Sequence, residues 1–429
     1  MLSAVLVAAS CVLLVAATLQ LWWMMHAWRT PDTLRRTTFR EPDGAHHHSF
    51  SLLVPARHEE RVLGHTVEQM LRCEHTDFEI ILIVGHDDPG TAAIAHRLAE
   101  EHPERVRVVT DTHAAKNKPR AMNTALPHCR GDIVGVFDAE DIVHPELLTH
   151  VDAAFRGTGA DVVQAGVQLI NYDSDWYSVR NCLEYFFWFR SRLHLHAAKG
   201  FIPLGGNTVF VRTDLLRATG GWDGNCLAED CDLGVRLSSN GARTVVAYEA
   251  GLVTREETPD SLGGLFRQRT RWNQGFLQVL RKGEWRRLPW RQRMLARFTL
   301  WTPFFQAFTG LMTAIGLFIA LTGGIPLPIS LFAWLPVLPM GVMLVFECVG
   351  LHDFGRQYGF RVRPVHYARL VLGTPLYHLV LAAAAARAVW REYTGRTDWE
   401  LTRHVGAHLG RDERSDEHRD EHRDERVPA

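Results

Sequence analysis

The sequence predicts an α/β domain with a largely parallel sheet, flanked by apolar segments that are long enough to cross a membrane. Between residues 50 and 248, short apolar runs alternate with stretches of helical periodicity such as Arg61–Arg72 and Thr91–His102. That alternation is typical of parallel strands joined by helical crossovers. The predicted strands are Ser51–Val54, Glu79–Val84, Val106–Val109, Ile133–Phe137, Val162–Gln168 and Thr244–Ala247.

The first 28 residues contain no Lys, Arg, Asp or Glu. We interpret residues 1–28 as an uncleaved transmembrane anchor, because the positive n-region of a signal peptide is missing and Trp22-Trp23 lie where an interfacial belt is expected. A polar linker follows at residues 29–49 and carries Arg29, Arg35 and Arg36. The positive-inside rule then places the α/β domain, residues 50–260, on the cytoplasmic side of the cell membrane.

Beyond the α/β domain the chain returns to the membrane as a multi-pass protein. Residues 261–293 are rich in Arg and Trp and predict an interfacial helix. Residues 294–352 predict two transmembrane helices, in which Glu347 lies near an end. Residues 353–410 predict a basic loop with a re-entrant or interfacial hairpin, favoured over a further span because Arg flanks both ends. The charged tail, residues 411–429, predicts disorder.

Bulk composition excludes several classes of protein. A formal net charge of −1 over 429 residues argues against nucleic acid as a partner. Seven cysteines without a C-x-x-C pair indicate thiols in a reducing compartment. Neither a G-x-x-x-x-G-K-[ST] loop nor a strand-linked G-x-G-x-x-G is present, which removes P-loop ATPases and dinucleotide-binding enzymes.

Carboxylates cluster where the fourth predicted strand ends, at Asp138-Ala139-Glu140-Asp141. Ligands in such sheets bind beyond the carboxyl ends of the strands. Closely spaced acids repel one another unless a cation neutralises them, and oxygen ligands suit Mg²⁺ or Mn²⁺. The alternative is an acidic turn that caps the helix starting near Pro145.

The order of several motifs resembles the membrane-embedded family-2 glycosyltransferases of GT-A fold, the branch that includes cellulose, chitin and hyaluronan synthases. The likeness covers about residues 50–290. Asp138-Ala139-Glu140 resembles the D-x-D motif of this family. The other matching segments are Val54-Pro55-Ala56-Arg57-His58-Glu59-Glu60, Asn117-Lys118-Pro119-Arg120-Ala121-Met122-Asn123, Gly205-Gly206-Asn207-Thr208, Glu229-Asp230 of the T-E-D motif, and Gln268-x-x-Arg271-Trp272.

The resemblance implies a role for each matched residue on the donor side. Ala56, Arg57 and Glu59 would border the uridine of a UDP-sugar, and Lys118 would lie against the nucleotide. Asp138 and Glu140 would hold Mg²⁺ or Mn²⁺ on the diphosphate. Asp88 would contact the base or ribose, with Asp87 as the alternative. The donor-side residues are Ala56, Arg57, Glu59, Asp88, Lys118, Asp138 and Glu140.

On the acceptor side, the resemblance makes Glu229 and Asp230 the catalytic pair, with Asp230 deprotonating the acceptor hydroxyl. Gln268 and Arg271 would hold the leaving diphosphate, and Trp272 would stack on the acceptor sugar. The chemistry agrees, because a planar guanidinium fits phosphate oxygens and a base on the opposite face favours inversion. Taken by itself, this motif also fits an interfacial helix with snorkelling Arg and anchoring Trp.

Some positions depart from the family pattern. Glu140 replaces the second Asp of D-x-D, so Asp141 is an alternative metal ligand. Ala228 stands where T-E-D has Thr. Thr397-Asp398-Trp399-Glu400 resembles a tail element of related bacterial enzymes.

Three functions remain open at this point. The first is an inverting, metal-dependent UDP-sugar transferase that extends a polysaccharide through its own spans. The second places a single sugar on a membrane lipid, and it stays open because three spans are few for a channel within one chain. The third is a non-catalytic membrane protein that senses nucleotide. Homo-oligomerisation would supply a wider channel for the first function.

Overall fold

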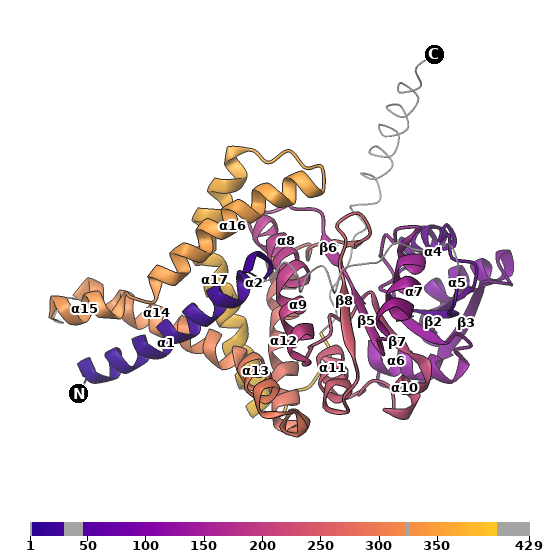
Figure 1. The fold of residues 1–429 in the computed structure, drawn as a ribbon, viewed down its shortest axis with the longest axis horizontal. Coiled ribbons are helices and arrows are strands. Elements are labelled where there is room, and N and C mark those ends of the chain that lie inside the picture. The colour runs from indigo at the N-terminus through magenta and orange to yellow at the C-terminus, as the bar shows by residue number, and fades with distance from the viewer. Residues whose placement is uncertain (1, 30–45, 323–325, 401–429) are drawn as a thin grey trace, which may run out of the picture.

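The computed structural model describes residues 2–29, 46–322 and 326–400. Most of the predicted linker 29–49 and all of the predicted tail 411–429 lie outside these residues. A helical region and a globular α/β region lie on opposite sides of the molecule (Figure 1).

The globular region is built on a seven-stranded sheet with strand order β3-β2-β1-β4-β7-β5-β8. Every neighbouring pair is parallel except the two pairs that β7 makes with β4 and β5. The α/β prediction and its six strands are confirmed. The strands are β1 (Phe50–Ala56), β2 (Phe78–Gly85), β3 (Val106–Asp111), β4 (Ile133–Val136), β5 (Val162–Ala165), β7 (Val209–Arg212) and β8 (Thr244–Ala247).

Successive residues of the central strands bury against helices on opposite faces of the sheet. Leu52 and Ile80 belong to one core with α4 (Leu63–Leu71), α5 (Pro89–Glu101) and α7 (Leu147–Thr158). Leu53 and Ile81 belong to the other core, which takes in α6 (Lys118–Ala125), α9 (Leu193–Lys199), α10 (Thr213–Ala218) and α11 (Glu229–Ser239). This two-sided burial explains why these strands are apolar throughout instead of alternating.

The predicted strand Val162–Gln168 is divided into two. Its second part, β6 (Val167–Leu169), pairs in parallel with β9 (Thr254–Glu256) in a separate two-stranded sheet. The break falls at Gly166, where a Cβ would lie 2.8 Å from Val253 Cγ1. The small sheet brings Glu256 toward the carboxyl end of the main sheet, where ligands are expected.

Four helical segments are long and apolar enough to cross a membrane, judged by length and composition: Leu6–Met24, Thr302–Ile319, Leu327–Gln357 and Pro364–Tyr393. They correspond to α1 (Leu2–Met24), α14 (Thr302–Thr322), α15 (Leu327–Ala333) with α16 (Val337–Gln357), and α17 (Pro364–Tyr393). In Figure 1, α1, α14 and α15 extend away from the sheet. The protein is therefore membrane-associated.

The last segment differs from the predicted hairpin: α17 is one continuous 30-residue helix despite Pro375. It packs against α14 on one side and against α12 (Leu262–Lys282) on the other. This packing stabilises the helix across the position where Pro375 removes a backbone donor. Part of its apolar surface is buried in these contacts, whereas Leu372, Leu376 and Leu379 are exposed.

A cluster of polar residues joins the membrane-associated helices to the α/β domain. Arg180 of α8 (Ser178–Phe187) forms an ion pair with Glu347 of α16. The Arg180 guanidinium offsets the cost of placing the Glu347 carboxylate in an apolar segment, and Glu347 is buried against the protein.

Candidate active site

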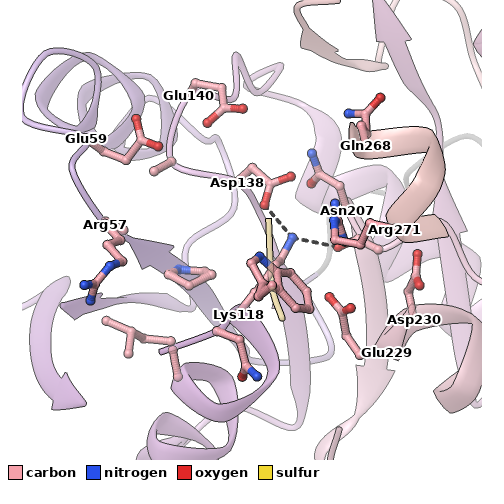
Figure 2. Close-up of a pocket in the computed structure, with 18 of the residues that line it drawn as sticks. Arg57, Glu59, Lys118, Asp138, Glu140, Asn207, Glu229, Asp230, Gln268 and Arg271 are labelled. Carbon is pink, nitrogen blue, oxygen red and sulfur yellow. Dashed lines mark hydrogen bonds and ion pairs between the residues drawn. The ribbon is translucent and has the colours of Figure 1, made fainter. Parts of the chain in front are cut away.

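A cavity opens at the carboxyl ends of the parallel strands, as expected for this class of sheet (Figure 2). The segments that follow β1 and β4 form one side of it, and the starts of α6 and α11 together with α12 form the other. Eleven of the site residues predicted from the sequence line this cavity: Ala56, Arg57, Glu59, Lys118, Asp138, Glu140, Glu229, Asp230, Gln268, Arg271 and Trp272.

Lys118 lies at the centre of the cavity (Figure 2). It begins α6, whose N-cap residue Asn117 accepts a hydrogen bond from Arg120 N at 3.0 Å. Lys118 Nζ forms an ion pair with Asp138 and donates to Gly206 O at 3.0 Å. Asp138 and the neighbouring carboxylate of Glu229 raise the pKa of Lys118 although its burial acts in the opposite direction. The lysine is therefore a fixed positive charge beside the strand end.

The structure distinguishes the two candidate metal ligands that follow Asp138. Asp141 is buried, and its two carboxylate oxygens accept from Asp138 N at 2.7 Å and from Asn207 Nδ2 at 2.9 Å. Burial, followed by the charges of Glu256 and its acidic neighbours, raises the pKa of Asp141 well above its usual range. Asp141 thus stabilises the loop that follows β4 through these two hydrogen bonds, whereas Asp138 and Glu140 line the cavity.

The donor set fits a hard divalent cation. Nine carboxyl side chains line the cavity against four cationic ones, Arg57, Lys116, Lys118 and Arg271. Burial and the charges of Asp138 and Glu140 raise the pKa of Glu256 to about 8. Such an acidic excess calls for a further cation, and carboxylate oxygens are the ligands that Mg²⁺ and Mn²⁺ prefer. Asp138 and Glu140 are the residues placed to hold it.

Glu229 and Asp230 start α11 on the opposite side of the cavity. Burial, followed by the charge of Asp230, raises the pKa of Glu229 to about 7. Burial also raises the pKa of Asp230, although its Oδ1 accepts from Cys231 N at 2.7 Å. Gly206, at φ +69°, lets the loop approach this pair, because a Cβ there would lie 2.7 Å from Asp230 Oδ2. Two neighbouring carboxyls whose pKa values are raised by burial are suited to proton transfer.

Helix α12 presents Gln268, Arg271 and Trp272 to the cavity. The helix approaches the start of α11 so closely that a Cβ on Gly275 would lie 2.3 Å from Ala228 Cβ. This contact explains why a small residue stands where the T-E-D motif has Thr. It also brings the Arg271 guanidinium beside Glu229 and Asp230, where its charge lowers the pKa of both carboxyls against the effect of burial.

The C-terminal segment also reaches the cavity, through Trp399 and Glu400. The Arg271 guanidinium lies 4.6 Å from the Trp399 ring centroid. Glu400 accepts from Arg387 at 2.6 and 2.9 Å and from Arg391 at 2.8 Å, both on α17. These ion pairs fasten the segment to α17 and place the indole over Arg271.

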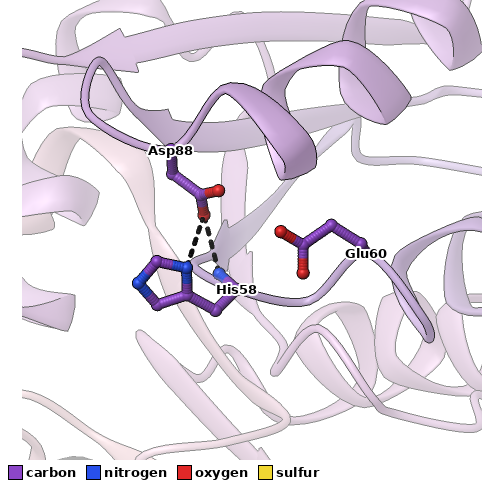
Figure 3. A group of neighbouring side chains, drawn as sticks. All are labelled: His58, Glu60 and Asp88. Carbon is purple, nitrogen blue, oxygen red and sulfur yellow. Dashed lines mark hydrogen bonds and ion pairs between the residues drawn. The ribbon is translucent and has the colours of Figure 1, made fainter.

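Asp88 is the one predicted site residue that is not among the residues lining the cavity. It is 2% exposed and caps α5, with Oδ1 accepting from Thr91 N at 3.3 Å and Oδ2 from His58 N at 2.7 Å. Figure 3 shows it beside His58 and Glu60, whose ligand atoms lie within 4.8 Å of one another. Its neighbour Asp87 is the residue that binds Arg57, at 2.8 and 3.0 Å.

Several lining residues were not predicted as site residues. Glu256 and Glu257 reach the cavity from the small second sheet, and their approach depends on a strand pairing that carries no motif. Asn207 belongs to Gly205-Gly206-Asn207-Thr208, one of the segments that resemble the family, and it donates to both Asp141 and Glu256. Trp399 and Glu400 did carry a signal, since their segment resembles a tail element of related enzymes.

Comparison with known proteins agrees with this geometry. The family model described as "Glycosyltransferase like family 2" matches residues 47–275, more than half of the chain. The chain is 26% identical over 381 residues to the beta-monoglucosyldiacylglycerol synthase of Synechocystis, an alignment covering 83% of this chain and 75% of that protein. It is 22% identical to the poly-beta-1,6-N-acetyl-D-glucosamine synthase of Staphylococcus epidermidis, over 55% of this chain and 56% of that protein.

A solved structure has the same fold. A mannosyltransferase from Pyrobaculum calidifontis, in complex with GDP-Man and Mn²⁺, superposes with a TM-score of 0.64 at 18% identity, covering 92% of this chain and all of that one. The GT-A fold expected from the motifs is thereby confirmed. With the family model matching the segment that carries the D-x-D-like, T-E-D-like and Q-x-x-R-W residues, the chain belongs to the family-2 glycosyltransferases.

Proposed function

We propose that the protein transfers a sugar from a nucleoside diphosphate, UDP in the first instance, to a hydroxyl of a membrane lipid, with inversion and with a divalent metal. The observation that carries the proposal is the convergence of Asp138, Lys118, Asp230 and Arg271 on one cavity. The two cations offer a place for a diphosphate, and Asp230 offers a base.

The leaving group is handled by positive charge. Lys118 is fixed against Asp138, and Arg271 offers a planar guanidinium from α12. A divalent cation held by Asp138 and Glu140 would neutralise charge that develops on the diphosphate as the glycosidic bond breaks. Arg57, held by Asp87, lies at the end of β1, where the nucleoside would bind.

The acceptor is activated on the other side. Asp230 would take the proton of the acceptor hydroxyl while the oxygen attacks the anomeric carbon. Its raised pKa, caused by burial, brings it closer to working pH and strengthens it as a base. Attack from the face opposite the leaving diphosphate inverts the anomeric centre.

The acceptor class is argued from the rest of the chain. The similarity to a beta-monoglucosyldiacylglycerol synthase extends over 83% of this chain, beyond the family-matching segment. A lipid acceptor needs only access from the bilayer, and the apolar helices start directly beside the α/β domain (Figure 1).

A second candidate, extension of a polysaccharide, is favoured by the similarity to poly-beta-1,6-N-acetyl-D-glucosamine synthases. That similarity covers about half of this chain, and the few spans would require several copies to form a channel.

The test is nucleotide release by the purified protein with a panel of UDP- and GDP-sugars, Mn²⁺ and diacylglycerol. We expect turnover with one donor, loss in excess EDTA, and a drop of about 10³-fold in Asp230→Asn with nucleotide binding retained. The matched control is Asp214→Asn, an acid at the start of α10 and outside the cavity. A product of one sugar per lipid supports the proposal, and a polymer supports the second candidate. Undiminished activity in Asp230→Asn, or in excess chelator, would refute the mechanism.

A further inference from the structure

The chain between α12 and the spanning helix α14 forms a short helix with two different faces. It comprises a 3₁₀ turn (Glu284–Arg287) and α13 (Trp290–Leu300), and α14 starts two residues later. One face of α13 is buried: Leu295, Ala296 and Leu300 pack with Trp285 and Leu288 against the α/β domain. The orientation of α13 about its own axis is therefore fixed, and the other face is directed away from the domain.

The outward face carries an apolar stripe. Trp290 is 68% exposed, Met294 57% and Trp301 38%. Trp290 and Met294, at positions i and i+4, lie on one line along α13, and Trp301 directly follows the helix. By comparison, α12, which was predicted as the interfacial helix, is largely covered by α17 and the α/β domain.

Arginines surround this stripe. Arg286, Arg287, Arg291, Arg293 and Arg297 are all exposed. The guanidinium of Arg291 lies 5.4 Å from the Trp290 ring and that of Arg297 lies 5.7 Å from the Trp301 ring. We call these five arginines with Trp290, Met294 and Trp301 the juxtamembrane face.

None of the five arginines forms an ion pair with a carboxylate within the described part of the chain. Basic residues on the neighbouring helices do form such ion pairs: Lys282 of α12 pairs with Asp223 and Asp232, and Arg387 of α17 pairs with Glu400. The sequence from Arg286 to Phe346 contains no Asp or Glu at all. The juxtamembrane face therefore holds a positive charge that the protein leaves unneutralised.

We propose that the juxtamembrane face binds anionic phospholipid headgroups in the leaflet beneath the α/β domain. Trp301 directly precedes α14, so the face lies at the depth where the bilayer begins, and its apolar stripe suits the headgroup boundary. Arginine clusters next to a spanning helix attract anionic lipid. An acidic protein would have to displace headgroups to reach the same surface.

The test measures lipid retention and not catalysis, so it is independent of the proposed function. The full chain is purified in detergent and presented with equal amounts of phosphatidylglycerol and phosphatidylcholine, and bound lipids are counted by native mass spectrometry. We expect about a tenfold preference for phosphatidylglycerol. The variant R286Q/R287Q/R291Q/R297Q should lose it.

Two further variants keep the test decisive. The control R61Q/R97Q/R130Q/R243Q makes the same charge change at exposed positions of the α/β domain and should keep the preference. The variant R286K/R287K/R291K/R297K retains the charge and should also keep it. Equal retention of both lipids by the wild type, or an intact preference in the glutamine variant, would overturn the proposal. So would a wild type that binds polyglutamate but shows no preference for phosphatidylglycerol, since the face would then accept an acidic protein.

Discussion

Glu229 and Asp230 form a buried pair of carboxyls, and the pair should set the acidic limb of the pH profile. The pKa of Glu229 is raised to about 7, so the pair holds a proton below that pH. Since a raised carboxyl pKa favours the protonated form, the base becomes available only as pH rises through it. We expect kcat/KM to increase with pH and to level off above about 7.

Glu229→Gln removes the group that titrates near neutrality. Asp230 then titrates without the negative charge of Glu229 beside it, while Arg271 and Lys118 remain, so the acidic limb should move to lower pH by about one unit. Glu60→Gln, at an exposed position outside the cavity, should leave the limb in place. The measurement is kcat/KM from pH 5 to 9, and an unmoved limb in Glu229→Gln would show that the pair does not control proton transfer.

We expect the three acids after β4 to have two different roles: Asp138 and Glu140 bind the metal, and Asp141 stabilises the loop. Asp138→Asn and Glu140→Gln should each raise the Mn²⁺ concentration for half-maximal activity at least about tenfold. Asp141→Asn should leave that concentration nearly unchanged but lower stability by about 1–2 kcal/mol, because one of two buried acceptors is lost. Mn²⁺ titrations and urea unfolding measure the two effects. A metal defect confined to Asp141→Asn would reverse the assignment.

At the level of residues, motif order predicted most of the cavity lining, because each motif follows a strand or starts a helix whose position the fold determines. Asp88 shows the limit of this reasoning. It stands next to Asp87 in the sequence, and which of the two turns toward Arg57 depends on the capping of α5. Glu256 reaches the site through a pairing between short strands, which no local pattern indicates.

Among the elements, the C-terminal segment is the one whose contribution to the site can be tested most directly. Glu400 is bound by Arg387 and Arg391, and it positions Trp399 over Arg271. We expect Glu400→Gln to lower kcat/KM about tenfold without changing the Mn²⁺ requirement, since the indole is no longer held in place. Steady-state kinetics with varied donor and varied acceptor would show which substrate is affected.

The control for this change is Asp398→Asn. The side chain of Asp398 is 83% exposed, and its Oδ2 lies 4.0 Å from Arg391 Nη2, which is a weak contact. If Glu400 acts through Trp399, the double variant Glu400→Gln/Trp399→Ala should be no worse than Trp399→Ala alone. Additive losses would mean that the two residues contribute separately.

Elements with strong local patterns were predicted correctly, and those defined by their neighbours were not. The central strands are uninterrupted apolar runs buried on both faces, so composition alone indicates them. Strand β7 directly follows Gly205-Gly206-Asn207-Thr208, which resembles a segment of the family, and its antiparallel pairing with β4 is a tertiary property. Helix α17 contains Gly373 and Pro375, which locally favour a break, but packing against α12 and α14 keeps it continuous.

At the scale of the whole molecule, α17 contacts the α/β domain near its start and α12 near its end. Near its start, Arg369 pairs with Asp173 at 2.6 Å. In its middle, Tyr377 donates to Glu184 at 2.9 Å. Near its end, Arg391 donates to Gln274 of α12 at 2.9 Å, beside the segment that reaches the cavity. Because α12 itself packs against α11 of the α/β domain, we infer that both ends of α17 lie on the domain's side of the membrane.

We therefore expect three crossings, by α1, α14 and α15 with α16, although α17 is long and apolar enough to be a fourth. Single cysteines at three exposed positions test this: Leu327→Cys at the start of α15, Arg361→Cys before α17 and Thr397→Cys after it. In intact cells, an impermeant maleimide should label the Leu327→Cys variant more strongly than it labels the parent protein. The variants with cysteine at positions 361 and 397 should exceed the parent level only after the cells are permeabilised. Labelling of 397 from outside would place the end of α17 across the bilayer from position 361, and the contact of Trp399 with Arg271 could not exist in the membrane.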